Sequence, residues 1–274
     1  MLAKNILIAD SGSTKTEWRY VTADGRSYLY RTDGVNPYYQ TRDEIVRQIE
    51  TQLLPYLSNF PDIVHFYGAG CSIDKAPIVQ DALRTLFPAA DIEVGSDLLG
   101  AARLTCGAEP GIVCILGTGS NSCHYNGASI QHNVSPLGYI LGDEGSGAVL
   151  GKLLVGDVLK KQLSEELCTT FMKRFNVTPA TLMEHVYKRP FPNRYLAQFA
   201  VFYAEHPEEQ QLKDLLYTAF NAFVQRNLLQ YEAVHKLPIH FVGSIAYHYA
   251  DTLKEVLAQH NLKATTIRKT LFEQ

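Results

Sequence analysis

The residues near the start of the chain that can do chemistry are one carboxylate and the small polar residues after it. Asp10 comes directly after residues 6–9, an apolar run typical of a buried strand. Residues 11–14 read Ser-Gly-Ser-Thr, whose hydroxyl and backbone N–H groups can approach a phosphate closely. A carboxylate beside such a turn can hold a magnesium ion, directly or through water. These residue types predict a phosphate loop, and an ordinary hairpin with a polar turn is the alternative interpretation.

The chain after this turn favours a hairpin over a loop that leads into a helix. Residues 17–21 alternate between polar and apolar side chains, which predicts a return strand. The Walker A pattern needs Gly-Lys at the end of its loop and a helix after it. Neither feature is present here, so the predicted phosphate loop is of a different type.

The same pattern returns in the second half of the chain. Pro110-Gly111 precedes an apolar run at 112–116, small hydroxyl-bearing residues follow at 117–122, and 123–126 predicts a return strand. Two such hairpins, each opening one half of the chain, are more specific than either alone. They favour a nucleotide bound between duplicated domains, which we expect to span residues 1–107 and 108–274.

Two further polar residues come where predicted strands end or break. Asp97 follows the strand expected at 91–94, and ligands of parallel α/β sheets bind at the carboxyl ends of strands. It is therefore a candidate catalytic carboxylate, and it can also be the N-cap of the next helix. Asn36 precedes Pro37 in a break after the third strand, where an amide usually shapes a turn but can also bind a ligand hydroxyl.

The second half of the chain holds two more glycine-containing candidates. Residues 142–147 read Gly-Asp-Glu-Gly-Ser-Gly, and we expect Asp143 to open a helix that runs to about residue 161. Acidic residues suit a helix N-terminus, so this stretch is either a plain helix start or a polyol site. Gly243-Ser244 lies between a predicted strand and a predicted helix, where it could receive an adenosine.

Hydrophobic periodicity supplies the elements that must position these residues, and it predicts an α/β fold. Strands are expected at 6–9, 17–21, 27–32, 63–67, 91–94, 112–116, 123–126, 239–242 and 263–267. Helices are expected at 43–57, 74–87, 98–104, 143–161, 165–175, 179–188, 193–205, 208–234 and 247–259. The helices between about 165 and 235 form an insertion in the second domain.

Composition narrows the class of protein. The 274 residues are 46% hydrophobic and 19% charged, as expected for two globular domains of ordinary size. A net charge of -3 without a basic run disfavours nucleic acid as a partner. No apolar stretch is long enough for a membrane span, and the start leads into a strand without a signal peptide. Five scattered cysteines without a C-x-x-C pair predict a reducing cytoplasm and disfavour a zinc site.

Taken in order, these motifs resemble the group of N-acetylglucosamine kinases and BadF/BadG/BcrA/BcrD ATPases. This group belongs to the actin-like superfamily of acetate and sugar kinases, heat-shock chaperones and actin. The resemblance covers nearly the whole chain, and residues 117–121 and 142–146 are its most specific parts. It implies two ribonuclease-H-like domains that bind ATP and Mg²⁺ in an interdomain cleft.

The resemblance also implies roles for the matching positions. Asp10 would order the magnesium ion, through water, and Asp97 would be the catalytic base. The sugar would be held by Asn36, Asp97, Leu137, Gly138 and Asp143. The nucleotide would be held by Gly12, Ser13, Thr14, Lys15, Gly117, Thr118, Gly119 and Ser120 at its phosphates and by Gly243 and Ser244 at its adenosine.

The implied activity is ATP-dependent phosphorylation of an amino sugar, foremost N-acetylglucosamine at its 6-hydroxyl, by a cytoplasmic homodimer. The group usually carries Gly-Gly-Trp-Gly where this chain has Ser135-Pro136-Leu137-Gly138, which leaves glucosamine and N-acetylmuramic acid open as acceptors. The chain also ends soon after residue 269, where relatives often continue, so we expect a short or missing C-terminal helix.

Two other functions compete with a kinase. An ATPase activator of a dehydratase or reductase would hold an iron–sulfur cluster through cysteine thiolates. Cys106 and Cys114 match no cluster pattern. A sugar-binding regulator without catalysis would not need both Asp10 and Asp97.

Overall fold

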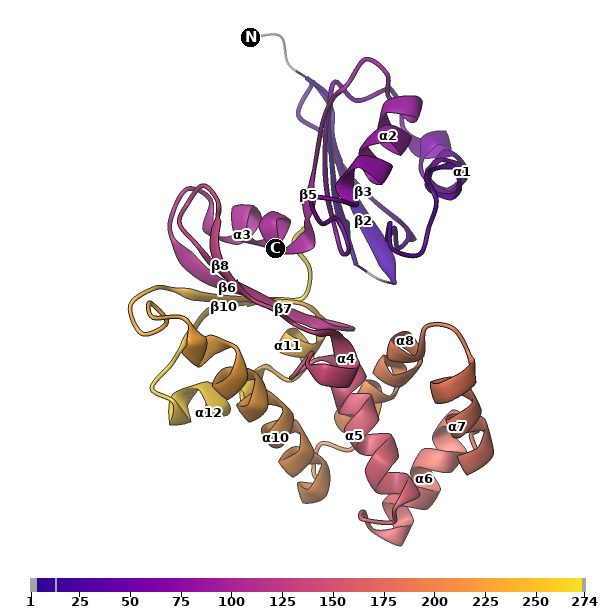
Figure 1. Ribbon diagram of the computed structural model, residues 1–274, viewed down its shortest axis with the longest axis vertical. Coiled ribbons are helices and arrows are strands. Elements are labelled where there is room, and N and C mark those ends of the chain that lie inside the picture. Colours follow the sequence, from indigo (N-terminus) through magenta and orange to yellow (C-terminus); the bar gives the residue numbers. More distant parts are fainter. Residues whose placement is uncertain (1–3, 13, 273–274) are drawn as a thin grey trace. The chain divides into compact units, whose positions relative to one another are not determined.

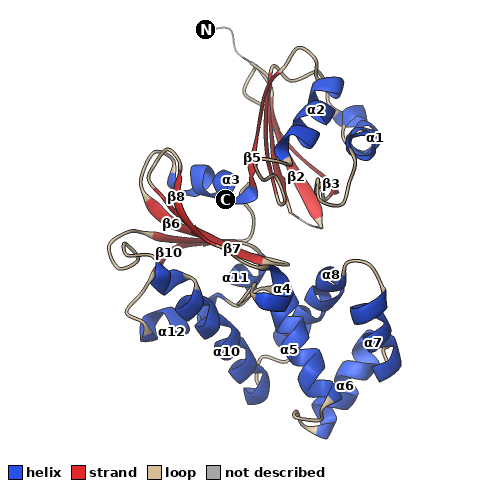
Figure 2. Cartoon of the chain, in the orientation of Figure 1, coloured by secondary structure: helices blue, strands red, loops and turns tan. Residues whose placement is uncertain are grey.

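The computed structural model describes residues 4–12 and 14–272 of the chain (Figure 1). The chain divides into two compact units, with the division between Leu104 and Thr105. We call them the N-terminal unit and the C-terminal unit. Each unit contains one five-stranded sheet with helices packed against it (Figure 2), which confirms the predicted α/β class.

The sheet of the N-terminal unit has the strand order β3-β2-β1-β4-β5. Its first three strands form an antiparallel meander, and β4 and β5 run parallel to β1. The carboxyl ends of β1, β4 and β5 therefore meet at one edge of the sheet. The strands are β1 (Ile6–Ser11), β2 (Lys15–Val21), β3 (Ser27–Asp33), β4 (Ile63–Gly68) and β5 (Asp91–Ser96).

The helices α1 (Arg42–Gln52) and α2 (Ala76–Leu86) cover one face of this sheet (Figure 1). The alternation of β1 and β2 directs Leu7, Ala9 and Trp18 into the core beneath them, where each is fully buried. A capping box at Thr41 fixes the start of α1. A third helix, α3 (Asp97–Cys106), begins immediately after β5.

The sheet of the C-terminal unit has the strand order β10-β9-β6-β7-β8. Here β6, β7 and β8 form the antiparallel meander, while β9 and β10 run parallel to β6. This unit therefore repeats the strand arrangement of the first. The strands are β6 (Gly111–Leu116), β7 (Ser120–Tyr125), β8 (Ile130–Val134), β9 (Ile239–Val242) and β10 (Ala264–Arg268).

The helices of the C-terminal unit share one large core with their sheet. Three 3-10 turns interrupt or end helices in the described residues, at Leu54–Tyr56, Gln198–Ala200 and Leu228–Gln230. No helix in residues 4–12 and 14–272 is long and apolar enough to cross a membrane. The helices are α4 (Gly138–Leu141), α5 (Gly147–Leu159), α6 (Glu165–Phe175), α7 (Pro179–Lys188), α8 (Pro192–Ala197), α9 (Val201–Glu205), α10 (Gln210–Arg226), α11 (Ser244–His248) and α12 (Ala250–Gln259).

Several predicted boundaries are wrong for identifiable reasons. Strand β8 was not expected, and neither was the short helix α4. The helix expected from 143 begins at Gly147, because the Ser146 hydroxyl accepts a hydrogen bond from Val149 N–H and caps it. The helix expected over 43–57 ends at Gln52, just before a 3-10 turn that contains Pro55.

Candidate functional site

The first hairpin turn lies between β1 and β2, at the carboxyl end of the central strand. Gly12 N–H donates to the carbonyl of Lys15 across the turn, at 2.9 Å. The Ser11 hydroxyl is 2.7 Å from the Thr16 hydroxyl and also bonds the backbone of Val35. These bonds fix the base of the turn rigidly. Ser13, which we predicted to face a phosphate, lies outside the described residues.

Asp97 stands at the carboxyl end of β5 as the first residue of α3. Its Oδ1 accepts a hydrogen bond from Leu98 N–H at 2.8 Å. The alternative role of Asp97 as the N-cap is wrong, because the Ser96 hydroxyl accepts from Leu99 N–H and caps the helix instead. Burial raises the pKa of Asp97 to about 6, against the opposing effect of the Leu98 N–H bond. Asp97 can therefore take up a proton near neutral pH.

Asp10, at the end of β1, shares this edge of the sheet with Asp97. The pKa of Asp10 is raised to about 7, mainly by burial and then by the nearby carboxylates of Asp97 and Glu17. Lys15 opposes this rise but has the smallest effect of the four. An ionised Asp10 here lacks sufficient positive charge from the protein. A bound cation would supply that charge, so the site suits a metal ion.

Asn36 is buried beside the loop that follows β4. Its Oδ1 accepts from Tyr38 N–H at 3.0 Å, and no partner for its Nδ2 is found among the described residues. Gly70 has φ of +79°, and a Cβ at this position would collide with Asn36 Oδ1 and come within 2.9 Å of the Tyr38 ring. Asn36 therefore makes the predicted turn and also leaves two donor hydrogens available.

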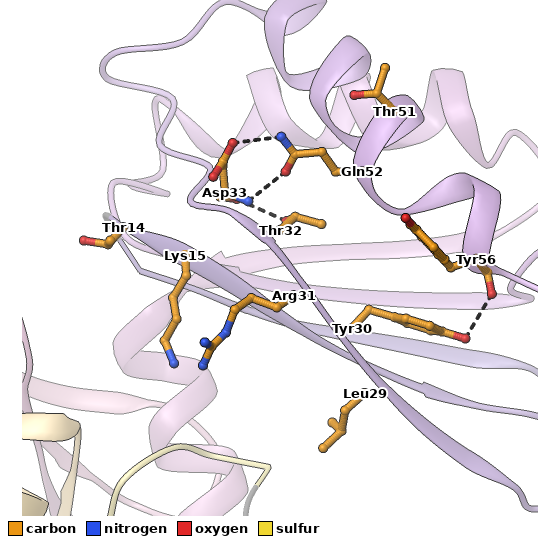
Figure 3. A pocket seen from close by; sticks show the side chains of 10 residues that line it. All are labelled: Thr14, Lys15, Leu29, Tyr30, Arg31, Thr32, Asp33, Thr51, Gln52 and Tyr56. Carbon is orange, nitrogen blue, oxygen red and sulfur yellow. Dashed lines mark hydrogen bonds between the residues drawn. The ribbon is translucent and has the colours of Figure 1, made fainter.

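Lys15 forms an ion pair with Glu17, whose carboxylate also pairs with Arg31 at 3.0 Å. The Lys15 and Arg31 side chains extend in the same direction in Figure 3. Both line a pocket of about 690 Å³ to which Asp10, Asn36 and Asp97 contribute nothing. The residues that line it are Thr14, Lys15, Leu29, Tyr30, Arg31, Thr32, Asp33, Thr51, Gln52 and Tyr56.

The second hairpin turn, residues 117–119 of the C-terminal unit, is fastened to the start of α5. Gly117 N–H donates to the carbonyl of Gly119 within the turn at 2.9 Å. The first two N–H groups of α5, from Gly147 and Ala148, donate to the carbonyls of Gly117 and Thr118 at 2.8 and 3.0 Å. The N-terminus of α5 therefore holds the turn in place, and these N–H groups are not available to a phosphate.

Asp143 lies against this turn and does not open a helix as predicted. Its backbone has φ of +53°. Its N–H group donates a hydrogen bond to the carbonyl of Pro136 at 2.8 Å. Its Oδ1 accepts from Ser120 N–H at 3.3 Å. Burial raises the pKa of Asp143 to about 6, and the neighbouring Glu144 carboxylate adds to the effect. Glu144 itself pairs with Arg226 at 2.5 Å, so it serves the structure of the unit.

Leu137 directly precedes α4 and Gly138 is its first residue, and both lie in the left-handed region, with φ of 59° and 72°. Leu137 is exposed, and a Cβ on Gly138 would meet no atom within 4 Å. Gly243, the candidate for adenosine, has φ of +124°, and a Cβ there would strike the Leu116 carbonyl. The structure thus places Gly243 and the adjacent Ser244 beside the turn at 117–119.

The predicted residues form one group in each unit. Asp10, Gly12, Asn36 and Asp97 gather at one sheet edge, while Gly117–Ser120, Asp143 and Gly243 gather at the other hairpin. Gly70 and Ser96 position these residues and were missed by the sequence analysis. The glycine pair at 68 and 70 after a strand was the available signal for Gly70.

No group of three or more His, Cys, Asp or Glu side chains in the described part of the chain could hold a metal ion. A protein cage for a cation is therefore not found there. Magnesium does not need one, since it is commonly bound by one or two carboxylates together with water and substrate phosphates. Asp10 meets that requirement.

The chain is similar to several solved structures. A scan of protein-family models gave no match, and a search of curated proteins gave none. A Porphyromonas gingivalis protein provisionally named N-acetylglucosamine kinase is 46% identical, with a TM-score of 0.93 over 97% of this chain and 95% of that one.

Two more distant structures share the fold. A Chromobacterium violaceum protein, also provisionally named N-acetylglucosamine kinase, is 18% identical with a TM-score of 0.72 over 99% of this chain and 97% of that one. A ROK family glucokinase from Streptomyces griseus, solved with glucose and AMPPNP, is 12% identical with a TM-score of 0.57 over 97% and 95%. Because of its 46% identity to the Porphyromonas protein over nearly its whole length, the chain belongs to the family of the N-acetylglucosamine kinases, with the fold of the actin-like ATPases.

Proposed function

We propose that the protein is an ATP-dependent kinase that transfers the γ-phosphoryl group to the 6-hydroxyl of an amino sugar, N-acetylglucosamine. The observation that carries this proposal is the pair of carboxylates, Asp10 and Asp97, at one sheet edge of a chain 46% identical to a protein named for this activity. Phosphoryl transfer depends mainly on positioning and on neutralisation of charge. The two carboxylates would supply a base and a group that orders a magnesium ion through water.

Asp97 is the proposed base. The sugar 6-hydroxyl gives its proton to the Asp97 carboxylate as its oxygen forms a bond to the γ-phosphorus, and the bond from that phosphorus to ADP breaks. The pKa of about 6 suits this role, because most Asp97 is ionised at neutral pH yet still accepts a proton readily. The bond from Leu98 N–H orients the carboxylate, and the Ser96 cap fixes the start of the helix that carries it.

Asp10 is the proposed magnesium residue, through water. A magnesium ion would neutralise charge on the ATP phosphates. Desolvation and the neighbouring Asp97 carboxylate raise the pKa of Asp10 to about 7, and a nearby cation would favour its ionised form, which supports the assignment. Gly12 and Thr14 are proposed to bind phosphate near it, together with Ser13 and Lys15. Lys15 would have to leave Glu17 to do so.

The C-terminal unit is proposed to bind the rest of the nucleotide. The turn from Gly117 to Ser120 offers small residues to the phosphates, and Gly243-Ser244 next to it would receive the adenosine. The rigid attachment of the turn to α5 reduces the entropy that would be lost on binding.

Asn36, Leu137, Gly138 and Asp143 are the proposed sugar contacts besides Asp97. Asn36 can donate from Nδ2 to a sugar hydroxyl while its Oδ1 remains bonded to Tyr38 N–H. The exposed Leu137 stands where relatives of the family usually carry tryptophan. We also propose a cytoplasmic homodimer, and the free cysteines of the described residues suit a reducing compartment.

The experiment that tests this function is ADP formation from Mg-ATP against a panel of hexoses and hexosamines. We expect release that depends on N-acetylglucosamine, with the 6-phosphate identified by phosphorus NMR. Slow release that ignores every sugar would contradict the proposal and favour the ATPase activator, for which iron analysis of the purified protein is the next measurement. The sugar kinases among the similar structures favour the kinase.

A further inference from the structure

The segment that contains Asp143 and the turn at 117–119 form one hydrogen-bonded assembly inside the C-terminal unit. Gly147 and Ala148, at the start of α5, hold the carbonyls of Gly117 and Thr118 at 2.8 and 3.0 Å. Two of the three residues of the turn are therefore anchored to the helix. The third, Gly119, accepts a hydrogen bond from Gly117 N–H within the turn at 2.9 Å, and one side chain lies close to its Cα.

That side chain is Asp143. Its Oδ1 accepts from Ser120 N–H at 3.3 Å, and a Cβ built on Gly119 would lie 3.1 Å from its Oδ2. The Asp143 backbone has little freedom of its own, since its N–H donates to Pro136 and its carbonyl accepts from Ser146 N–H at 3.0 Å. A rotation of the carboxylate therefore changes its contacts with Gly119 and Ser120.

We propose that Asp143 couples the two substrates, because it binds the sugar and at the same time positions Gly119 and Ser120 for the nucleotide phosphates. This inference rests on the proposed function, which assigns Asp143 to the sugar. A sugar hydroxyl that bonds the carboxylate fixes its orientation, and it thereby also fixes the contacts of Asp143 with Gly119 and Ser120. Occupancy of the sugar site thereby strengthens nucleotide binding.

The test measures the coupling directly. Isothermal titration gives the Kd of a non-hydrolysable Mg-ATP analogue without sugar and with saturating N-acetylglucosamine. The Kd without sugar divided by the Kd with sugar is called the ratio below. Thermodynamic couplings of this kind are commonly about 5- to 150-fold, and we expect a ratio of roughly tenfold in the wild-type protein. The same ratio must appear when the sugar is titrated with and without the nucleotide, since coupling is reciprocal.

Two substitutions of Asp143 separate the hydrogen bond from the charge. In Asp143→Ala the ratio falls to about one, even at sugar concentrations that compensate for weaker sugar binding. Asp143→Asn retains an oxygen that can accept from Ser120 N–H, and it retains most of the ratio. An unchanged ratio in Asp143→Ala, or equal losses in both variants, overturns the inference.

A matched pair of glycine substitutions tests the same contact without removing a polar group. Gly119→Ala crowds the Asp143 carboxylate and lowers the ratio, whereas a Cβ on Gly117 meets no atom within 4 Å. Gly117→Ala can weaken nucleotide binding but leaves the ratio near that of the wild type. Equal ratios in these two variants overturn the inference. This pair decides the matter if Asp143→Ala no longer binds sugar.

Failure of the inference and failure of the proposed function give different results. A wild-type protein that phosphorylates N-acetylglucosamine but shows a ratio of about one refutes the coupling alone. A protein without sugar-dependent ADP release refutes the kinase and the coupling together.

Discussion

Asp10, Asp97 and Asp143 share one physical property, a pKa raised above the usual value of a carboxyl group. Burial is the largest cause for each of them. A protein loses stability when it keeps such groups ionised at neutral pH, so their presence indicates a task that requires charge. In the proposed function, that task is phosphoryl transfer.

The replacement of Asp97 by Asn should remove the base and leave its surroundings intact. General-base groups contribute about 10²- to 10⁴-fold to rate, so we expect turnover to fall within that range. The Kd of the nucleotide should change little, because Asp97 is assigned to the sugar. The two quantities are measured by coupled ADP assay and by titration. Full activity in Asp97→Asn would disprove its assignment as the base.

The pH dependence of the reaction should report the ionisation of Asp97. The carboxylate accepts a proton only when ionised, so kcat/KM for the sugar should fall as the pH drops through about 6. The profile is measured at saturating Mg-ATP, so that the metal residue is occupied throughout. The residual activity of Asp97→Asn should lack this acid limb. If kcat/KM of the variant still falls at low pH, the ionisation of another group, and not of Asp97, causes the fall.

The replacement of Asp10 by Asn should stabilise the fold while it abolishes activity. The folded protein holds the Asp10 proton with a pKa of about 7, against an ordinary value of 3.8. The folded state therefore binds this proton more tightly than the unfolded state does. The free energy of unfolding falls as the pH rises from about 3.8 to about 7. Without magnesium at pH 8 we expect a melting point higher by a few degrees, with a smaller difference at pH 5. A lower melting point at pH 8 would contradict this account.

At the scale of elements, the two hairpins were predictable because strand alternation and small turn residues are local signals. Strand β8 was not, since Ile130–Val134 is a largely exposed edge strand whose residues are polar at every interior position. Its pairing with β7 defines it, and that contact is not visible in the residues themselves.

The candidate site was predictable in part for the same reason. The strand-end position of Asp97 follows from the α/β pattern. That Ser96 and not Asp97 caps α3 could be seen only in the structure. Asp143 was expected in a helix because acidic residues favour a helix start. In the structure Ser146 takes that place, and Asp143 adopts a left-handed conformation against Ser120. That contact spans 23 residues, which no local pattern reports.

The loop after β4 gives a prediction at this scale, because Gly70 lies against the Asn36 side chain. Gly70→Ala would displace the Asn36 side chain and strain a backbone with φ of +79°. We expect the KM for the sugar to rise severalfold, with little change in the Kd of the nucleotide. The matched control is Gly25→Ala, where φ is +86° and a Cβ meets no atom within 4 Å. Equal effects in both variants would mean that strain alone is responsible.

At the scale of the whole molecule, the proposed residues are divided between two units that each have their own sheet and core. The repeated meander of the two sheets explains why the hairpins recur in the sequence. The proposed base and the proposed metal residue belong to the N-terminal unit. The residues proposed for the adenosine, and Asp143, belong to the C-terminal unit.

Hydrogen exchange monitored by mass spectrometry tests this division directly. N-acetylglucosamine alone should slow exchange in peptides of both units, around Asn36 and Asp97 in one and around residues 137–143 in the other. A Mg-ATP analogue should protect residues 117–120 and 243–244 together with the first turn. Asn36→Ala is the control, since it should remove the effect of the sugar at low concentration and leave that of the nucleotide. Sugar protection confined to one unit would mean that the residues of the other do not bind the sugar, and the assignment of Asp143 would then be lost along with the coupling built on it.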